Sequence, residues 1–155
     1  MEKEEGIATL YVVGTPIGNL EDITYRAIRV LREVDYILCE DTRTTQILLN
    51  KYNIKTKTIS YHCHSSESKE SEIINLLKAG KNLALVSDAG TPCISDPGVL
   101  LVANVKKEFG DRVKISPVPG PSALISALSA SGISSAEFTF LGFLPHKKGR
   151  EKIFK

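Results

Sequence analysis

The sequence lacks the features that mark membrane, secreted and disulfide-stapled proteins. No apolar run reaches 18 residues, which excludes a membrane-spanning helix. The first residues are acidic and have neither the basic nor the apolar region of a secretory signal peptide. The three cysteines, Cys39, Cys63 and Cys93, are an odd and widely spaced set. We therefore predict reduced thiols in a cytoplasmic protein.

Strong charge bias is also missing. The formal net charge of +2 is too small to indicate a nucleic-acid-binding protein. The chain contains 42% hydrophobic and 25% charged residues, which are ordinary globular values and exclude a disordered chain. A length of 155 residues corresponds to one domain, which can bury a sizeable core without disulfides or metals.

Apolar segments of two periods alternate along the chain. Short β-branched runs predict strands at 7–13, 34–39, 57–61, 82–86, 113–116 and 137–141. Helical spacing predicts helices at 20–34, 42–49, 66–78, 97–109 and from Ser122 to Ala130. We expect Asn19, Asp41 or Thr42, and Asp96 to cap three of them. This alternation predicts an α/β fold, a mainly parallel sheet with helices on both faces.

Three predicted strands end in loops rich in glycine and proline, at 14–19, 87–98 and 117–122. Ligands of open α/β sheets bind beyond the carboxyl ends of the strands, so the loops predict one shared crevice for a small molecule. Glycine lets the backbone approach a ligand closely, and proline keeps a loop rigid. Any one of these loops alone could be an ordinary turn. Neither the phosphate-binding P-loop motif nor the dinucleotide fingerprint is present.

Two adjacent carboxylates, Glu40 and Asp41, follow the second predicted strand and precede Arg43. Such a group could position a substrate or accept a proton. The alternative is that Asp41 caps a helix and forms a local ion pair. Residues 61–64 contain two histidines and a cysteine, but their spacing does not suit a structural zinc pair, and we predict no metal site.

The tail differs from the rest of the chain. Five of residues 146–155 are Lys or Arg and one is an acid. We interpret 145–155 as a basic linker or the start of another helix. Because the chain stops inside this pattern, we expect the sequence to be part of a longer protein.

Four motifs resemble a known family. They are residues 10–27 (LYVVGTPIGNLEDITYRA), 39–43 (CEDTR), 86–98 (VSDAGTPCISDPG) and 117–123 (PVPGPSA). Together they closely resemble the bacterial 16S ribosomal RNA cytidine 2′-O-methyltransferases, a family of the tetrapyrrole methylase superfamily. The resemblance runs from about Ala8 to Leu144.

The resemblance implies an enzyme that uses S-adenosylmethionine (SAM) to methylate a ribose 2′-hydroxyl of 16S rRNA in the small ribosomal subunit. It implies that residues 1–144 are the first of two α/β domains around a SAM cleft, commonly in a homodimer. The chain alone would then be inactive and at best a weak SAM binder. By position, the implied cofactor contacts are Pro16, Ile17, Asp88, Ala89, Gly90, Thr91, Ile94, Ser122 and Ala123. Thr91 replaces an aspartate of the tetrapyrrole enzymes.

Glu40 and Asp41 fall where some superfamily members carry a catalytic acid. We expect one of them to orient or deprotonate the 2′-hydroxyl, with Arg43 binding a nearby phosphate. Two alternatives remain open: a tetrapyrrole-type methylase of small molecules, and a non-catalytic module that binds SAM or a nucleotide.

Overall fold

The computed structural model describes residues 8–62, 67–145 and 149. The chain divides into two compact units between Ala123 and Leu124. The interpretations of Cys63, of the residue-66 helix start and of nearly all of the basic tail lie outside the described residues.

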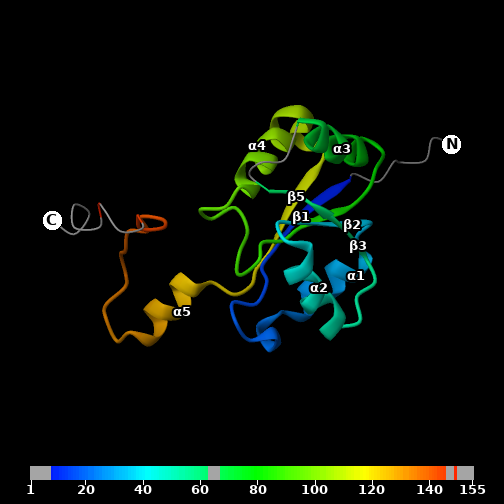
Figure 1. Cartoon of the computed structure of the whole chain (residues 1–155). Coiled ribbons are helices and arrows are strands. Elements are labelled where there is room, and N and C mark those ends of the chain that lie inside the picture. Colours follow the sequence, from blue (N-terminus) through cyan, green and yellow to red (C-terminus); the bar gives the residue numbers. More distant parts are fainter. Residues whose placement is uncertain (1–7, 63–66, 146–148, 150–155) are drawn as a thin grey trace. The chain divides into compact units, whose positions relative to one another are not determined.

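The first unit is built on five parallel strands in the order β3-β2-β4-β1-β5 (Figure 1). The strands are β1 (Thr9–Val13), β2 (Tyr36–Cys39), β3 (Lys57–Ser60), β4 (Leu83–Leu85) and β5 (Lys114–Val118). Tyr11 pairs with Ala84 of β4 and with Ser116 of β5, so β1 lies inside the sheet and β3 and β5 form its edges. The predicted parallel α/β sheet is confirmed.

Both faces of the sheet are covered by helices. Alternation along β2 sends Ile37 and Cys39 to one face and Leu38 to the other. The first face packs against α1 (Tyr25–Glu33) and α2 (Thr42–Lys51). The second packs against α3 (Glu67–Lys78) and α4 (Gly98–Phe109), as Figure 1 shows. Because both faces are buried, the strands are apolar runs and not alternating ones.

The start of α2 agrees with the predicted capping residue, but the start of α1 does not. Asp41 caps α2, as expected, by accepting a hydrogen bond from the N–H of Arg43. Asn19, however, caps only the short 3-10 turn Leu20–Asp22, and α1 starts after Thr24, whose hydroxyl accepts from the N–H of Ala27 at 3.0 Å. Thr24, which was not predicted as a cap, therefore starts the helix that packs on the sheet.

The second unit contains most of α5 (Ala123–Ala130). The strand predicted at 137–141 is wrong, because these residues form no regular element. Phe138 and Phe140 are about half exposed, with 50% and 45% of their surface accessible. A strand needs a neighbour to satisfy its backbone, and the described part of this unit offers none. Among the described residues, no helix is long and apolar enough to cross a membrane.

Candidate functional site

The three glycine- and proline-rich loops meet at the carboxyl edge of the sheet. Thr15 and Gly90 exchange two backbone hydrogen bonds of 2.9 and 3.0 Å, which join the loops after β1 and β4. The Thr15 hydroxyl, which is buried, also donates to the carbonyl oxygen of Ser87 at 3.2 Å. The Thr91 hydroxyl donates to the carbonyl oxygen of Pro121 at 3.1 Å, which ties the β4 loop to the β5 loop. The loops therefore form one connected surface.

Two glycines let the β1 and β5 loops touch through their backbones. A Cβ atom added to Gly14 would lie 2.8 Å from the Cα of Gly120, and one added to Gly120 would lie 2.9 Å from the Cα of Gly14. Any side chain at either position would push the two loops apart. The N–H of Gly14 also donates to the carbonyl oxygen of Val118 at 3.1 Å. This contact fixes the spacing of the loops.

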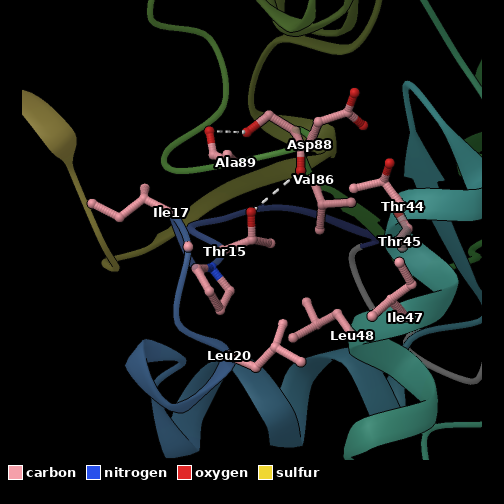
Figure 2. A pocket seen from close by; sticks show the side chains of 13 residues that line it. Thr15, Ile17, Leu20, Thr44, Thr45, Ile47, Leu48, Val86, Asp88 and Ala89 are labelled. Atoms are coloured by element: carbon pink, nitrogen blue, oxygen red, sulfur yellow. Dashed lines mark hydrogen bonds between the residues drawn. The ribbon is translucent and has the colours of Figure 1, made fainter.

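A cavity of about 320 Å³ lies between the β1 loop, the β4 loop and the first turns of α2. Figure 2 shows Thr44, Ile47 and Leu48 of α2 on one side of it and Ile17 and Leu20 on the other. The volume is at the lower end of the range for small-molecule sites. The full lining is Thr15, Pro16, Ile17, Gly18, Leu20, Thr44, Thr45, Ile47, Leu48, Val86, Ser87, Asp88 and Ala89.

The predicted cofactor residues separate into two groups around this cavity. Pro16, Ile17, Asp88 and Ala89 line it. Gly90 does not line it, but its φ of +84° and its bonds to Thr15 set the course of the loop. The other predicted contacts lie outside the lining and within or next to the joined β4 and β5 loops: Thr91, Ile94, Ser122 and Ala123.

Ile94 lies in the strained part of the β4 loop. Its neighbours Cys93 and Ser95 have φ values of +69° and +52°, a conformation that costs energy in residues other than glycine. One oxygen of Asp96 holds this turn by accepting from the N–H of Cys93 at 3.1 Å and from the N–H of Gly98 at 2.8 Å. The prediction that Asp96 is the N-cap and Pro97 the first residue of this helix is wrong by one residue, because α4 starts at Gly98 and Pro97 occupies the N-cap position. The Ile94 side chain is left 57% exposed.

The two adjacent carboxylates predicted as catalytic groups, Glu40 and Asp41, do not line the cavity, and they are engaged differently. Both oxygens of Asp41 bind the Arg43 guanidinium, at 3.1 Å to Nε and 2.8 Å to Nη2. This bonding lowers the pKa of Asp41 to about 2. The N–H of Asp41 donates to a carboxylate oxygen of Asp88 at 3.2 Å, which connects β2 to the β4 loop. Both the cap and the local ion pair are therefore present at Asp41.

Glu40 has the opposite electrostatic environment. Burial raises its pKa, the negative charges of Asp96 and Asp88 raise it further, and His62 lowers it. Among the described residues, the Glu40 carboxylate makes no hydrogen bond or ion pair. A half-buried carboxylate with a raised pKa is suited to exchange protons.

The contribution of α2 to the cavity was not predicted from the sequence. Thr44, Ile47 and Leu48 are spaced i, i+3 and i+4 and so share a helix face, but this spacing is also that of an ordinary core-facing helix. Thr45 is buried and hydrogen-bonds the Cys39 thiol, whose pKa burial raises. Cys63 and His64 of the 61–64 segment are outside the described residues, and within the described part no group of three His, Cys, Asp or Glu side chains could hold a metal ion.

Comparison with known proteins yields close relatives. The chain is 53% identical over 146 residues to ribosomal RNA small subunit methyltransferase I of Thermotoga maritima, covering 94% of this chain and 64% of the relative. It is 48% identical over 151 residues to the protein of the same name from Halalkalibacterium halodurans, covering 97% of this chain and 51% of that one. The chain thus spans about half to just under two thirds of the length of these curated relatives.

Solved structures share the fold. A cobalt precorrin-4 methyltransferase, a cobalamin biosynthetic enzyme, matches with a TM-score of 0.61 at 20% identity, over 83% of this chain and 52% of its own. Uroporphyrin-III-C-methyltransferase from Thermus thermophilus matches with a TM-score of 0.59 at 22% identity, over 84% and 54%. The family model of the tetrapyrrole (corrin/porphyrin) methylases matches residues 9–153. The chain belongs to the tetrapyrrole methylase family.

Proposed function

We propose that this chain is the first-domain part of a SAM-dependent methyltransferase. The proposed substrate is the ribose 2′-hydroxyl of a cytidine in 16S rRNA, within the small ribosomal subunit in the cytoplasm. The observation that carries the proposal is the cavity at the carboxyl edge of the sheet, whose lining includes Asp88, one of the two acids that raise the pKa of Glu40, in a chain about 50% identical to small-subunit rRNA methyltransferases. We further propose that residues 1–144 form one wall of the SAM cleft and that the whole enzyme is a homodimer.

The residues around the cavity fit part of a SAM molecule. Apolar side chains such as Pro16 and Ile17 suit its uncharged portions, and the exposed carboxylate of Asp88 complements a positively charged ligand. At Gly90, the φ of +84° favours glycine, and the residue lies close to Ile17, because a Cβ atom there would be 3.4 Å from the Cγ2 of Ile17. These features support Pro16, Ile17, Asp88, Ala89 and Gly90 as cofactor residues. The rest of the SAM molecule is predicted to contact Thr91, Ile94, Ser122 and Ala123.

When bound, SAM supplies an electrophilic methyl group on a sulfonium sulfur. A ribose hydroxyl is a weak nucleophile at neutral pH and requires a base. We assign this role to Glu40, whose carboxylate would accept the proton that the 2′-hydroxyl loses when its oxygen takes the methyl group; the carbon–sulfur bond of SAM would break and leave a neutral thioether. Asp41 is less suited, because a carboxylate with a pKa of about 2 holds a proton weakly. Its role is to start α2 and to orient Arg43 toward a phosphate of the RNA.

Because this chain alone is expected to be inactive, the test uses the whole two-domain enzyme and combines SAM titration calorimetry with transfer of labelled methyl groups to small ribosomal subunits that lack this modification. Glu40→Gln should lower the methylation rate by about 10²- to 10⁴-fold with little change in SAM affinity. Asp41→Asn is the matched control, since asparagine is also a good N-cap, and it should lose less. Near-normal methylation by a Glu40→Ala, Asp41→Ala double variant would refute the assignment of the base.

The alternatives make different predictions. A tetrapyrrole-type methylase, as the solved neighbours are named, would transfer methyl groups to a macrocycle and not to ribosomal subunits. A non-catalytic module would bind SAM or a nucleotide and transfer nothing. We favour the RNA enzyme because the relatives at 48–53% identity carry that name, whereas the tetrapyrrole enzymes share 20–22% identity.

A further inference from the structure

A long segment beside the cavity contains basic residues and no acid. From Thr42 to Ser66 the sequence has no Asp or Glu, and its Arg43, Lys51, Lys55 and Lys57 give a formal charge of +4. The whole chain has a formal net charge of +2, so all other residues together are negative. All four of these side chains are exposed. We call them the α2–β3 surface.

This surface starts at the candidate site and leads away from it. Arg43 lies in the first turn of α2, next to Thr44, which lines the cavity. Eight helical steps of 1.5 Å each place Lys51 about 12 Å farther along. Lys55 and Lys57 continue into β3, the edge strand on this side of the sheet. The basic groups therefore form a path that begins at the cavity.

A neighbouring helix adds to the far end of the path. The Arg32 guanidinium of α1 donates to the backbone oxygen of Tyr52 at 2.7 Å, and the Thr56 hydroxyl donates to the backbone oxygen of Leu31 at 2.6 Å. These bonds hold the exposed Arg32 beside the residues that link α2 to β3. The fold thus gathers positive charge from two elements at one place.

Among the described residues, three other lysines of the first unit are paired with acids, whereas Lys106, Lys107 and Lys114 are not. Lys69 pairs with Glu72 at 2.7 Å, Lys78 with Glu108 at 2.8 Å and Lys81 with Asp35 at 3.0 Å. Among the described residues, Lys51, Lys55 and Lys57 have no such partner. A lysine in the last turn of α2 favours the helix dipole, but that explains Lys51 alone. Uncompensated like charges repel one another, so an anionic partner would relieve the repulsion.

Arg43 can take part as well. Asp41 occupies two of the five N–H donors of its guanidinium, and 90% of the side-chain surface is exposed. The carboxylate thus holds the arginine in one orientation and leaves donors for a second acceptor. Arginine in this state is well suited to a phosphate oxygen.

We propose that the α2–β3 surface binds the phosphates of the RNA strand that continues from the target nucleotide. This inference rests on the proposed function, because it presumes an RNA substrate at the cavity. Phosphate contacts position a nucleic acid without reading its sequence, which suits lysines spread along a helix and an edge strand. A local group of positive charges can attract phosphates even though the net charge of the whole chain is small.

The test compares two triple variants of the whole two-domain enzyme with equal loss of charge. One is Lys51→Gln, Lys55→Gln, Lys57→Gln. The control is Lys106→Gln, Lys107→Gln, Lys114→Gln, which removes three exposed lysines from α4 and from β5 at the opposite edge of the sheet. Binding to small ribosomal subunits is measured by filter retention from about 50 to 200 mM KCl. Thermal melting checks that both variants are folded.

We expect the first variant to bind about ten-fold or more weakly near 0.1 M salt, with a log–log salt slope smaller by about two to three. The control should stay close to the unaltered protein. Equal losses in both variants would overturn the proposal, and so would a loss that does not change with salt, which would indicate a ribosomal protein as the contact. SAM affinity and methyl transfer are recorded separately. If binding weakens as expected but no protein transfers methyl groups, the proposed function fails and the RNA surface stands.

Discussion

The backbone contact between Gly14 and Gly120 allows a sharp test of how the site is built. In Gly14→Ala, the new Cβ would lie 2.8, 3.0 and 3.3 Å from the Cα, N and C atoms of Gly120. Carbon atoms in ordinary contact are about 3.5 to 4.0 Å apart, so the two loops must separate by about 1 Å. The obstacle is backbone, which cannot rotate away as a side chain could. Gly14 does not have a left-handed φ, so the penalty is steric alone.

Overpacking of this kind costs about 1–3 kcal/mol. In a chain of 155 residues, each kcal/mol lowers Tm by roughly 2–4 °C. We therefore expect Gly14→Ala to lower Tm by a few to about ten degrees in circular dichroism melts, and to weaken SAM binding in calorimetry. A shift of the β1 loop should weaken SAM binding because it would also displace Thr15, whose backbone hydrogen bonds with Gly90 join the β1 loop to the β4 loop.

Gly80→Ala is the control for stability. Gly80 ends α3 with a φ of +74° and has no atom within 4 Å of its would-be Cβ, so alanine there costs about 1–2 kcal/mol through strain, away from the predicted cofactor residues. It should lower Tm comparably and leave SAM affinity unchanged. If Gly14→Ala melts within about 1 °C of the unaltered protein and binds SAM equally well, the loops tolerate widening and our reasoning is wrong.

Three further changes test other parts of the structure. Burial and the charges of Asp96 and Asp88 raise the pKa of Glu40, so the methylation rate should rise with pH through that raised pKa. Asp96→Asn should therefore move the acidic limb of the pH–rate profile to lower pH. An unmoved limb would exclude Glu40 as the titrating base. Thr24→Ala should destabilise α1 by about 1 kcal/mol in urea denaturation, with Thr24→Ser close to the original, whereas equal stability of both would show that the cap is dispensable. Leu10→Ala, at a position with no exposed surface, should lower the free energy of unfolding by about 2–5 kcal/mol, and a loss below about 1 kcal/mol would mean that the core repacks around it.

The sheet could be predicted because burial on both faces gives the inner strands β1, β2 and β4 short apolar runs with clear ends, whereas the edge strand β3 has no buried residue and a weaker pattern. Helix boundaries were harder to predict from the sequence, because Asn19 and Thr24 can both cap a helix and tertiary packing selects between them. The segment 137–141 shows the limit most clearly. Its alternation of Phe138 and Phe140 satisfies the local rule for a strand, but a strand also needs a partner, and that requirement is not written in the segment itself.

The candidate site was predictable only on the loop side. Glycine and proline at strand ends are a strong local signal, whereas a helix face formed by Thr44, Ile47 and Leu48 carries the same pattern as any helix that packs on a sheet. Only the path of the chain brings that face opposite the β1 loop.

The adjacent carboxylates Glu40 and Asp41 show why sequence adjacency does not make two groups equivalent. Their order along the chain left the roles of cap and base interchangeable, but α2 begins directly after Asp41, which commits that side chain to the helix start and to Arg43. Glu40, still at the end of the strand, is directed by the sheet into a region shared with Asp88 and Asp96. The same turn of chain therefore lowers the pKa of one carboxylate and raises that of its neighbour. Asp41 cannot act as the base in place of Glu40 unless its ion pair with Arg43 breaks. Arg43 would then no longer be held in the orientation proposed for binding a phosphate.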